Sequence, residues 1–160
     1  MEDGRESNSE RLLAQLRRDE GAVRDRDGRH LAYRCPAGKL TIGYGHNLDA
    51  EPVPGKEEGS TMPEYEARAL LQKDAALVKG QVTRTFPWAI RLDFPRYAVL
   101  VNMAFNMGLE GLRSFKNTLE DVKNGNYASA ARRMLASRWA GQVKARARRL
   151  SRQMETGQWQ

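Results

Sequence analysis

The sequence is poor in the side chains that build disulfides and metal sites. It has one cysteine and two histidines among 160 residues. A single cysteine cannot form a disulfide within the chain, which favours a reducing compartment or a thiol with a chemical task. Cys35, His30 and His46 also lack the spacing of zinc ligands. We therefore expect no metal site and no other cofactor.

Long apolar runs are absent as well. No stretch approaches the roughly 20 apolar residues of a membrane-spanning helix. The first ten residues, MEDGRESNSE, are too polar for a signal peptide. We expect a soluble protein made in a cytoplasm, and the length predicts a single domain over residues 1–160.

Acidic residues are missing from a long C-terminal stretch, although the whole chain carries a net charge of +7. There is none between Asp121 and Glu155. The cations of this stretch are Arg132, Arg133, Arg138, Lys144, Arg146, Arg148, Arg149 and Arg152. Such a block attracts a polyanion, such as nucleic acid, an anionic membrane or an acidic cell wall. It is equally typical of a solvated basic helix face, so charge alone does not name the partner.

The first half of the sequence predicts a helix, a small sheet and a second helix. The first helix follows Ser9 as its N-cap and ends before Gly21. Tight-turn sequences and alternating residues over 22–49 predict two or three short antiparallel strands. The second helix covers 61–80, with Ser60 or Thr61 as its cap and Gly80 at its end.

The second half is helical throughout. The apolar segment FPRYAVLVNMAFNMG predicts a buried central helix, and three amphipathic segments follow it. The predicted class is α+β, mainly α, with two lobes. An N-terminal sheet lobe with the first helix spans 1–60, a linking helix spans 61–80, and a helical lobe spans 81–160. A ligand cleft is expected between the lobes.

Three polar side chains are candidates for chemistry. Glu20 ends the first helix beside the sheet, where its carboxylate would project across the mouth of a cleft. Five residues with a Pro-Ala-Gly turn separate Cys35 from Thr41, so the two should face each other across a hairpin. A threonine hydroxyl can orient a water, and a thiol can do the same or act as a nucleophile if its pKa is depressed. The alternatives are a surface glutamate and a small buried cysteine.

The order of several motifs resembles one enzyme family. The segments LLAQLRRDEG, AYRCPAGKLTIGYGHNL, RYAVLVNMAFNMG, SFKNTL, AARRMLASRW and ARARRLSRQMETGQW are similar to those of the phage lysozymes of the T-even type, glycoside hydrolase family 24, which includes many endolysins. The resemblance extends from about Glu10 to the end of the chain. It implies a lysozyme-like fold and a peptidoglycan hydrolase that cleaves the β-1,4 bond between N-acetylmuramic acid and N-acetylglucosamine during host lysis.

The resemblance also implies roles for individual residues. Glu20 takes the place of the general acid at the end of the first helix. Cys35 stands where the family has an aspartate or a cysteine, and with Thr41 it would position the attacking water. The family's substrate-binding positions match Phe105, Thr118 and Arg133. A structural ion pair of the family matches His46 and Asp74.

One departure leaves alternatives open. Fourteen residues separate Glu20 from Cys35, whereas the family usually has eight. The extra residues predict an extended hairpin, and a change of strand register would let Asp25 or Asp27 take the second catalytic role. A lytic transglycosylase that uses Glu20 alone is a second interpretation. A non-catalytic, basic nucleic-acid- or wall-binding protein is a third.

The implied partners are the glycan strands of peptidoglycan and an anionic envelope surface, the latter bound through the basic C-terminal helices. We expect no nucleic acid partner and a monomeric protein. The enzyme would stay in the host cytoplasm until a holin-type lesion releases it, and it would then act on the wall from the periplasmic side.

Overall fold

The computed structural model describes residues 6–160, and the first five residues of the predicted domain lie outside the described residues. The chain forms two compact units, one ending at Leu77 and the other spanning Val78–Gln160. Each unit has its own buried apolar side chains. Within residues 6–160, every helix is too short or too polar to cross a membrane.

Helix α1 (Asn8–Glu20) opens the first unit. Its N-cap is Ser7 and not the predicted Ser9, because Ser7 forms a reciprocal capping box with Glu10. The Ser7 hydroxyl accepts from the Glu10 N–H, and the Glu10 carboxylate accepts from the Ser7 N–H, which satisfies two otherwise unpaired donors. Leu12 and Leu16, one turn apart, are fully buried.

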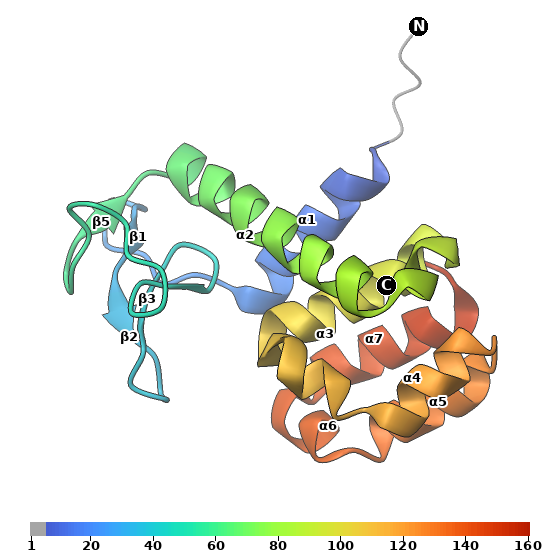
Figure 1. The fold of residues 1–160 in the computed structure, drawn as a ribbon. Coiled ribbons are helices and arrows are strands. Elements are labelled where there is room, and N and C mark those ends of the chain that lie inside the picture. The colour runs from blue at the N-terminus through green and yellow to red at the C-terminus, as the bar shows by residue number, and fades with distance from the viewer. Residues whose placement is uncertain (1–5) are drawn as a thin grey trace, which may run out of the picture. The chain divides into compact units, whose positions relative to one another are not determined.

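Two small antiparallel sheets follow α1 (Figure 1). One contains three strands in chain order, β2 (Tyr33–Arg34), β3 (Leu40–Ile42) and β4 (His46–Asn47). The other pairs β1 (His30–Leu31) with β5 (Thr61–Met62). The predicted antiparallel strands are therefore present, but residues 22–49 contain four of them and not two or three, and β5 is a further strand that the sequence did not indicate.

The extended hairpin predicted before Cys35 is also present. Arg24 bridges His30, and the Asp25 N–H donates to the Arg29 carbonyl at 2.9 Å. This hairpin leads into β1 and accommodates the additional residues between α1 and the three-stranded sheet.

Helix α2 (Glu64–Thr85) differs from its predicted bounds at both ends. Thr61 cannot cap it, because its backbone pairs with Leu31 in the second sheet. Gly80 lies inside the helix and does not end it. A glycine in a helix interior costs only about 1 kcal/mol relative to alanine, and the fully buried Val82 continues the packed face beyond it. The boundary between the two units falls within this helix.

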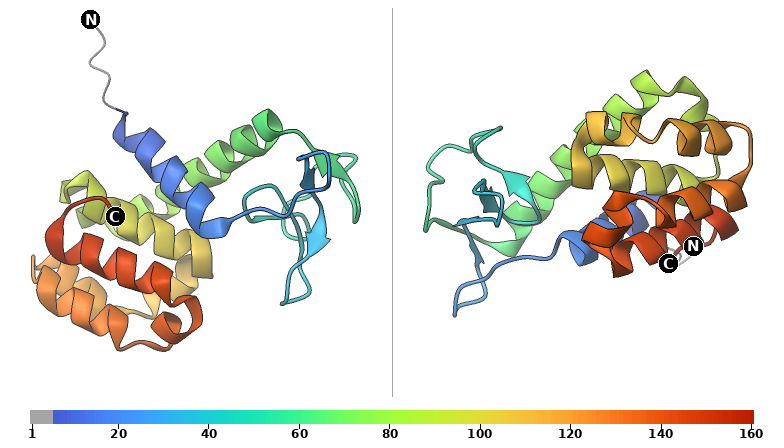
Figure 2. Two further views of the ribbon diagram at one scale, coloured as in Figure 1. Left: turned by 180° about the vertical axis from the view of Figure 1, so that it is seen from behind. Right: turned by 90° about the horizontal axis from the view of Figure 1, so that it is seen from below.

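The second unit is helical. It contains the end of α2 and then η1 (Pro87–Arg91), α3 (Phe94–Arg113), α4 (Lys116–Lys123), α5 (Tyr127–Leu135), α6 (Arg138–Val143) and α7 (Ala145–Thr156). Residues 98–104 of α3 are all buried, which confirms the predicted central helix. Helix α5 packs against α4 and α7, and α7 also packs against α3 (Figure 2). The structure thus confirms the α+β, mainly α, class.

Candidate active site

One face of the three-stranded sheet carries the predicted thiol and hydroxyl. Tyr33 lies opposite Thr41, which lies opposite Asn47 on the next strand. The Cys35 N–H donates to the Lys39 carbonyl at 2.9 Å, which continues the same register toward the turn. Directly opposed residues, and residues two apart on a strand, point to the same side of a sheet. We call the side shared by these five residues the site face.

The hairpin turn at the end of the site face is the predicted Pro-Ala-Gly turn. The Gly38 N–H donates to the Cys35 carbonyl at 2.7 Å, and Gly38 has φ 82°. Glycine adopts this left-handed conformation without a steric penalty, so the turn closes directly after Cys35. Cys35 is half-buried and Thr41 is buried. The opposite side of β3 and β4 presents Ile42 to the core, which fixes the orientation of the site face.

The surroundings of Cys35 favour its thiolate form. The pKa of the Cys35 thiol is lowered, chiefly by hydrogen bonding from the Lys39 backbone, while burial opposes the shift. Backbone hydrogen bonding from Ala37, the Thr41 hydroxyl and the charge of Lys39 lower the pKa further. The Thr41 hydroxyl lies 3.0 Å from the Lys39 carbonyl, to which it also donates. Its single proton therefore serves either that carbonyl or the sulfur.

Glu20 is the last residue of α1, and its carboxylate lies against the backbone of Gly45. A Cβ atom at Gly45 would stand 2.8 Å from Glu20 Oε2, which is closer than real Cβ contacts allow. Gly45 has φ 77° and immediately precedes β4. The glycine thus leaves the space that Glu20 occupies beside the sheet.

Tyr33 lies near both catalytic candidates. Its pKa is raised, first by burial of the phenol and then by the negative charges of Cys35 and Glu20. Tyr33 lies opposite Thr41 and two residues before Cys35 on the site face, and Glu20 reaches the same unit at Gly45, directly before β4. The sequence analysis did not select Tyr33. The only sequence signal for Tyr33 was its position two residues before Cys35. Strand β2 is too short to show an alternation of buried and exposed residues that would reveal which side Tyr33 faces.

Asp25 and Asp27 lie in the turn of the extended hairpin. The Asp25 carboxylate accepts from the backbone N–H groups of Asp27, at 2.9 Å, and Arg29, at 3.0 Å. Asp27 is exposed. Asp25 therefore holds the turn together, and neither aspartate belongs to the site face.

The second unit contains a pocket of about 720 Å³ that two of the predicted substrate residues line. Thr118 is buried in its wall, and Arg133 lies at its edge. Phe115 and Trp139 meet edge to face with ring centroids 6.0 Å apart, which gives the pocket an aromatic corner. Phe105 lies on α3 and does not belong to this pocket.

Arg133 is held in place by Asp121. Its Nε donates to Asp121 Oδ2 at 2.7 Å, and the Ser129 hydroxyl donates to the same oxygen at 2.8 Å. Hydrogen bonding from Ser129 and then from Arg133 lowers the pKa of Asp121. The guanidinium retains N–H groups that could bind a ligand in the pocket, since only Nε faces the carboxylate.

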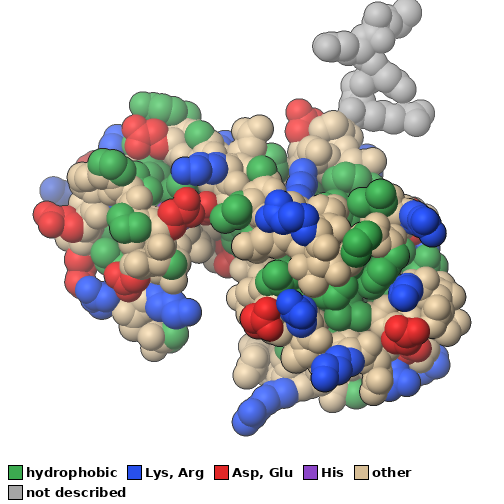
Figure 3. Space-filling model, in the orientation of Figure 1, with side chains coloured by type: hydrophobic (Ala, Val, Ile, Leu, Met, Phe, Trp, Pro, Cys, Tyr) green, Lys and Arg blue, Asp and Glu red, His purple; other side chains and the backbone are tan. Residues whose placement is uncertain are grey.

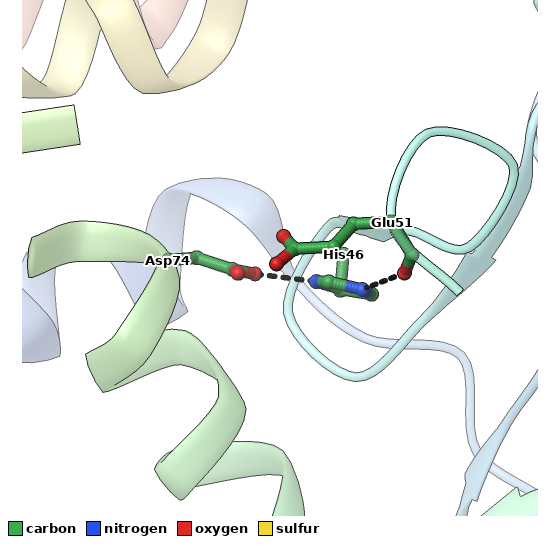
Figure 4. A group of neighbouring side chains, drawn as sticks. All are labelled: His46, Glu51 and Asp74. Carbon is green, nitrogen blue, oxygen red and sulfur yellow. Dashed lines mark hydrogen bonds and ion pairs between the residues drawn. The ribbon is translucent and has the colours of Figure 1, made fainter. Parts of the chain in front are cut away.

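His46 forms the predicted pair with Asp74 (Figure 4). Its Nδ1 lies 2.7 Å from Asp74 Oδ2, and its Nε2 lies 2.8 Å from the Glu51 carbonyl oxygen. Both partners are acceptors, so the doubly protonated ring suits them best. Burial lowers the pKa of His46, but these hydrogen bonds outweigh it and leave the pKa raised. The Glu51 carboxylate completes a group with metal-like spacing, yet a metal would need the nitrogen lone pair that protonation removes.

A second polar network, centred on Glu64, was not predicted. Its carboxylate accepts from Arg24 at 2.7 Å, from His30 at 2.9 Å, from Arg68 at 3.0 Å and from the Tyr44 hydroxyl. Burial raises the pKa of Glu64, but these donors outweigh it and hold the pKa far below its usual range. The network ties the hairpin and the first strand to the start of α2. Its members are far apart in the sequence, so no local pattern could have identified it.

The basic C-terminal block is not entirely at the surface. Arg146 is only 7% exposed, and its Nε and Nη2 donate to Asn102 Oδ1 at 3.0 and 2.8 Å. Its inclusion in a surface charge block was therefore wrong. Arg148 and Arg152, one turn apart on α7, are exposed, so the helix still presents positive charge to solvent.

Comparison with known proteins agrees with the predicted resemblance. The family model described as phage lysozyme matches residues 25–155. The probable T4-type lysozyme 2 of Dictyostelium discoideum is 28% identical over 145 residues, covering 78% of this chain and 85% of that protein. An endolysin of Acyrthosiphon pisum secondary endosymbiont phage 1 is 29% identical over 127 residues, covering 77% and 74%. The pre-baseplate central spike protein Gp5 of Enterobacteria phage T4 is 30% identical over 166 residues, covering 91% of this chain but 28% of the spike protein. The chain belongs to the phage lysozyme family and has the enzyme class of a lysozyme, a hydrolase of peptidoglycan.

Proposed function

We propose that this lysozyme cleaves the β-1,4 bond between N-acetylmuramic acid and N-acetylglucosamine in host cell lysis. The observation that carries the proposal is the placement of Cys35 and Thr41 on the site face, with Glu20 against Gly45 directly before β4. The family match begins at residue 25, so the role of Glu20 rests on its resemblance to the family's acid and on its placement against Gly45.

The proposed reaction is a single displacement by water. Protonated Glu20 gives its proton to the glycosidic oxygen as the bond from that oxygen to the sugar's anomeric carbon breaks. A water held by Thr41 and Cys35 attacks the anomeric carbon and loses a proton to the Cys35 thiolate, whose formation the lowered pKa favours. Glu20 ends as a carboxylate and Cys35 as a thiol, and proton exchange with solvent restores both. Attack from the face opposite the leaving group inverts the anomeric configuration.

We assign substrate binding in the second unit to the pocket lined by Thr118 and Arg133. Its aromatic corner offers an apolar surface, and its hydroxyl and guanidinium groups offer hydrogen bonds. Saccharide and peptide parts of the wall present both kinds of surface. Phe105 is assigned a substrate contact only from the family resemblance.

We also propose that the exposed cations of the C-terminal helices draw a monomeric enzyme to anionic envelope components, with no nucleic acid partner. The protein would accumulate in the host cytoplasm and reach the wall through a holin-type lesion. Cells that express it should then lyse after chloroform treatment and remain intact before it. Lysis without permeabilisation would contradict this route.

The test of the reaction is digestion of purified peptidoglycan by wild type, Glu20→Gln and Cys35→Ser, with mass analysis of the fragments. Loss of a general acid typically lowers the rate by about 10²- to 10⁴-fold, so Glu20→Gln should release almost no reducing muramic ends. Cys35→Ser should lose a large part of the rate, because serine is a far weaker base than a thiolate. Glu110→Gln removes one carboxylate from an exposed site and should retain full activity.

The other outcomes identify the competing activities. Anhydro ends in place of reducing ends would assign the chain to the lytic transglycosylases, which need no second catalytic group. Full activity of Cys35→Ser would return the second role to Asp25 or Asp27. No fragments from the wild type would exclude catalysis on this substrate.

A further inference from the structure

The helical unit has a second pocket, to which the proposed reaction gives no task. It has a volume of about 360 Å³ and is lined by residues of η1 and α4 and by the last residue of α3. Phe86 and Trp88 form its aromatic wall, with ring centroids 5.7 Å apart. Ala89, the next residue of η1, is fully buried and anchors this short helix, while Trp88 stays half-buried at the pocket. We call this recess the η1–α4 pocket.

Helix α4 supplies the opposite wall. Lys116, Leu119 and Lys123 are three and four residues apart, so they share one face of the helix. Leu119 is only 7% exposed and gives the wall an apolar base. Among the described residues, Lys116 and Lys123 form no ion pair, and both are exposed. Arg113 pairs with Glu110 across 3.5 Å, but both side chains are exposed, so this pair holds the guanidinium weakly.

The lining of the η1–α4 pocket is positively charged. It contains Arg113, Lys116 and Lys123 but one carboxylate, that of Glu120. Oε1 of Glu120 accepts from Asn124 Nδ2 at 3.2 Å, one turn along the same helix. An aromatic wall with an excess of cations suits a ligand that has both an apolar face and carboxylates.

The η1–α4 pocket adjoins the pocket already assigned to the substrate. Lys116 lines both of them. Two consecutive residues of α4 are buried in their walls, Thr118 in the first pocket and Leu119 in the η1–α4 pocket. A substrate bound in the first pocket can therefore extend past Lys116 into the second.

We propose that the η1–α4 pocket binds a muramyl peptide of the cell wall, with the apolar face of the sugar on Trp88 and the carboxylates of the stem peptide at Arg113 and Lys123. This inference rests on the proposed function and adds a binding site for a neighbouring part of the same substrate. It involves binding alone, and no covalent bond forms or breaks. A lipid surface is the less suitable occupant, because it is flat and would not enter a recess beside a half-buried indole.

The test follows each pocket through its own tryptophan. The chain has three, Trp88, Trp139 and Trp159, and Trp139 lines the first pocket. The full chain labelled with 5-fluorotryptophan is titrated with N-acetylmuramyl-L-alanyl-D-glutamate and observed by fluorine NMR. This probe has a sugar and free carboxylates but no glycosidic bond to another sugar, so the enzyme cannot cleave it. Loss of one signal in Trp88→Phe identifies the resonance of Trp88. We expect the probe to shift that resonance in a saturable way.

The test of the charges is Arg113→Gln with Lys123→Gln. Both residues line the η1–α4 pocket and not the first pocket, and both are exposed, so the variant should fold. At low salt, the Kd read from the Trp88 resonance should rise about tenfold. The probe with its carboxylates amidated should bind wild type about tenfold more weakly for the same reason.

Arg148→Gln with Arg152→Gln is the matched control. It removes the same charge from the second unit at exposed positions of α7 that do not line the pocket. Its Kd should stay within about twofold of wild type, because exposed charges beyond the Debye length are largely screened.

Three results would overturn the proposal. The first is a Trp88 resonance that the probe leaves unchanged, whether or not phosphatidylglycerol vesicles shift it. The second is an equal rise in Kd in the two double variants, which would make the attraction one of net charge. The third is equal affinity for the amidated probe. If the probe binds at Trp88 but peptidoglycan yields no fragments, the proposed function fails and the binding site stands. If fragments appear but the Trp88 resonance does not move, the function stands and this site fails.

Discussion

Gly45 determines how closely the proposed general acid can lie against the sheet. Glu20 Oε2 occupies the space that a side chain at this position would enter. The glycine also has a positive φ, so two independent constraints act on one residue. They can be separated by experiment, because only one of them concerns the carboxylate.

We expect Gly45→Ala to abolish most of the activity and to lower stability modestly. The left-handed conformation alone costs an alanine about 1–2 kcal/mol. The new methyl group also displaces Glu20, and a misplacement of about 1 Å in a catalytic group can lower the rate about 10²-fold. Release of reducing ends and urea unfolding measure the two effects.

Gly55→Ala is the control for the conformational cost. Gly55 has φ 76°, nearly that of Gly45, but a Cβ atom there would meet nothing within 4 Å. This variant should lose similar stability and keep its activity. Equal loss of activity in both variants would show that strain, and not the position of Glu20, limits catalysis.

The sequence predicted residues whose neighbours lie close in the chain. Cys35 and Thr41 meet across a short turn, and the turn residues indicate this directly. Tyr33 was missed because β2 has only two residues, too few to reveal which side each one takes. Glu20 comes to the sheet from another element, and its place against Gly45 depends on the fold and not on a local sequence pattern.

At the level of elements, the ion pair of His46 and Asp74 connects β4 to α2. The two acceptors around the ring are best satisfied by imidazolium, which explains the raised pKa of His46. The folded state therefore binds a proton more tightly than the unfolded state. The stabilisation is complete below the ordinary histidine pKa of about 6.5 and is lost as the pH rises through the higher pKa of the folded protein.

Asp74→Asn tests this dependence. At about pH 5.5 the variant should be less stable than wild type by about 1.5–3 kcal/mol, the range for hydrogen bonds to charged groups. The difference should narrow as the pH rises through the folded pKa, because wild type loses the charged ring there. Urea unfolding between pH 5.5 and 9 gives both free energies. A difference that is constant over this range would contradict the prediction, because His46 would then not change its charge between these pH values.

Several predicted helix boundaries differ from the observed ones. Ser9 and Thr61 are both plausible caps by residue type, yet Ser7 forms the capping box and Thr61 pairs with a strand. Glycine is common directly after a helix, but α2 extends past Gly80, and the buried side chain of Val82 belongs to its packed face. Local preferences of a few tenths to about 1 kcal/mol are outweighed by such contacts, which the sequence does not display.

The two units differ in charge more than the net value suggests. The second unit holds 15 of the 27 lysines and arginines but only 5 of the 20 acidic residues. The first unit therefore carries a small negative charge, and the whole excess of positive charge lies in the second. The face shown in Figure 3 agrees, with red and blue side chains mixed around the sheets and mostly blue ones around α4 to α7.

This asymmetry predicts which substitutions weaken attraction to an anionic surface. Arg148→Gln with Arg152→Gln should reduce binding to phosphatidylglycerol vesicles about 30-fold at low salt, at about 1 kcal/mol per charge near the surface. Arg11→Gln with Arg26→Gln removes the same charge from exposed sites in the first unit and should change binding little. Flotation with vesicles at two salt concentrations measures both. Equal losses in the two double variants would show that only net charge matters.

The extended hairpin before β1 has a consequence for how such enzymes are found. Its turn is closed by Asp25, and its second strand is held by β5, so it is stable through contacts of its own. Residues can therefore be added there while Glu20 still lies against Gly45. A search that demands a fixed number of residues between acid and thiol would discard this chain. A better sequence signature for such enzymes is the spacing of Gly45 from Cys35 and Thr41. This spacing depends on the sheet and not on the length of the hairpin.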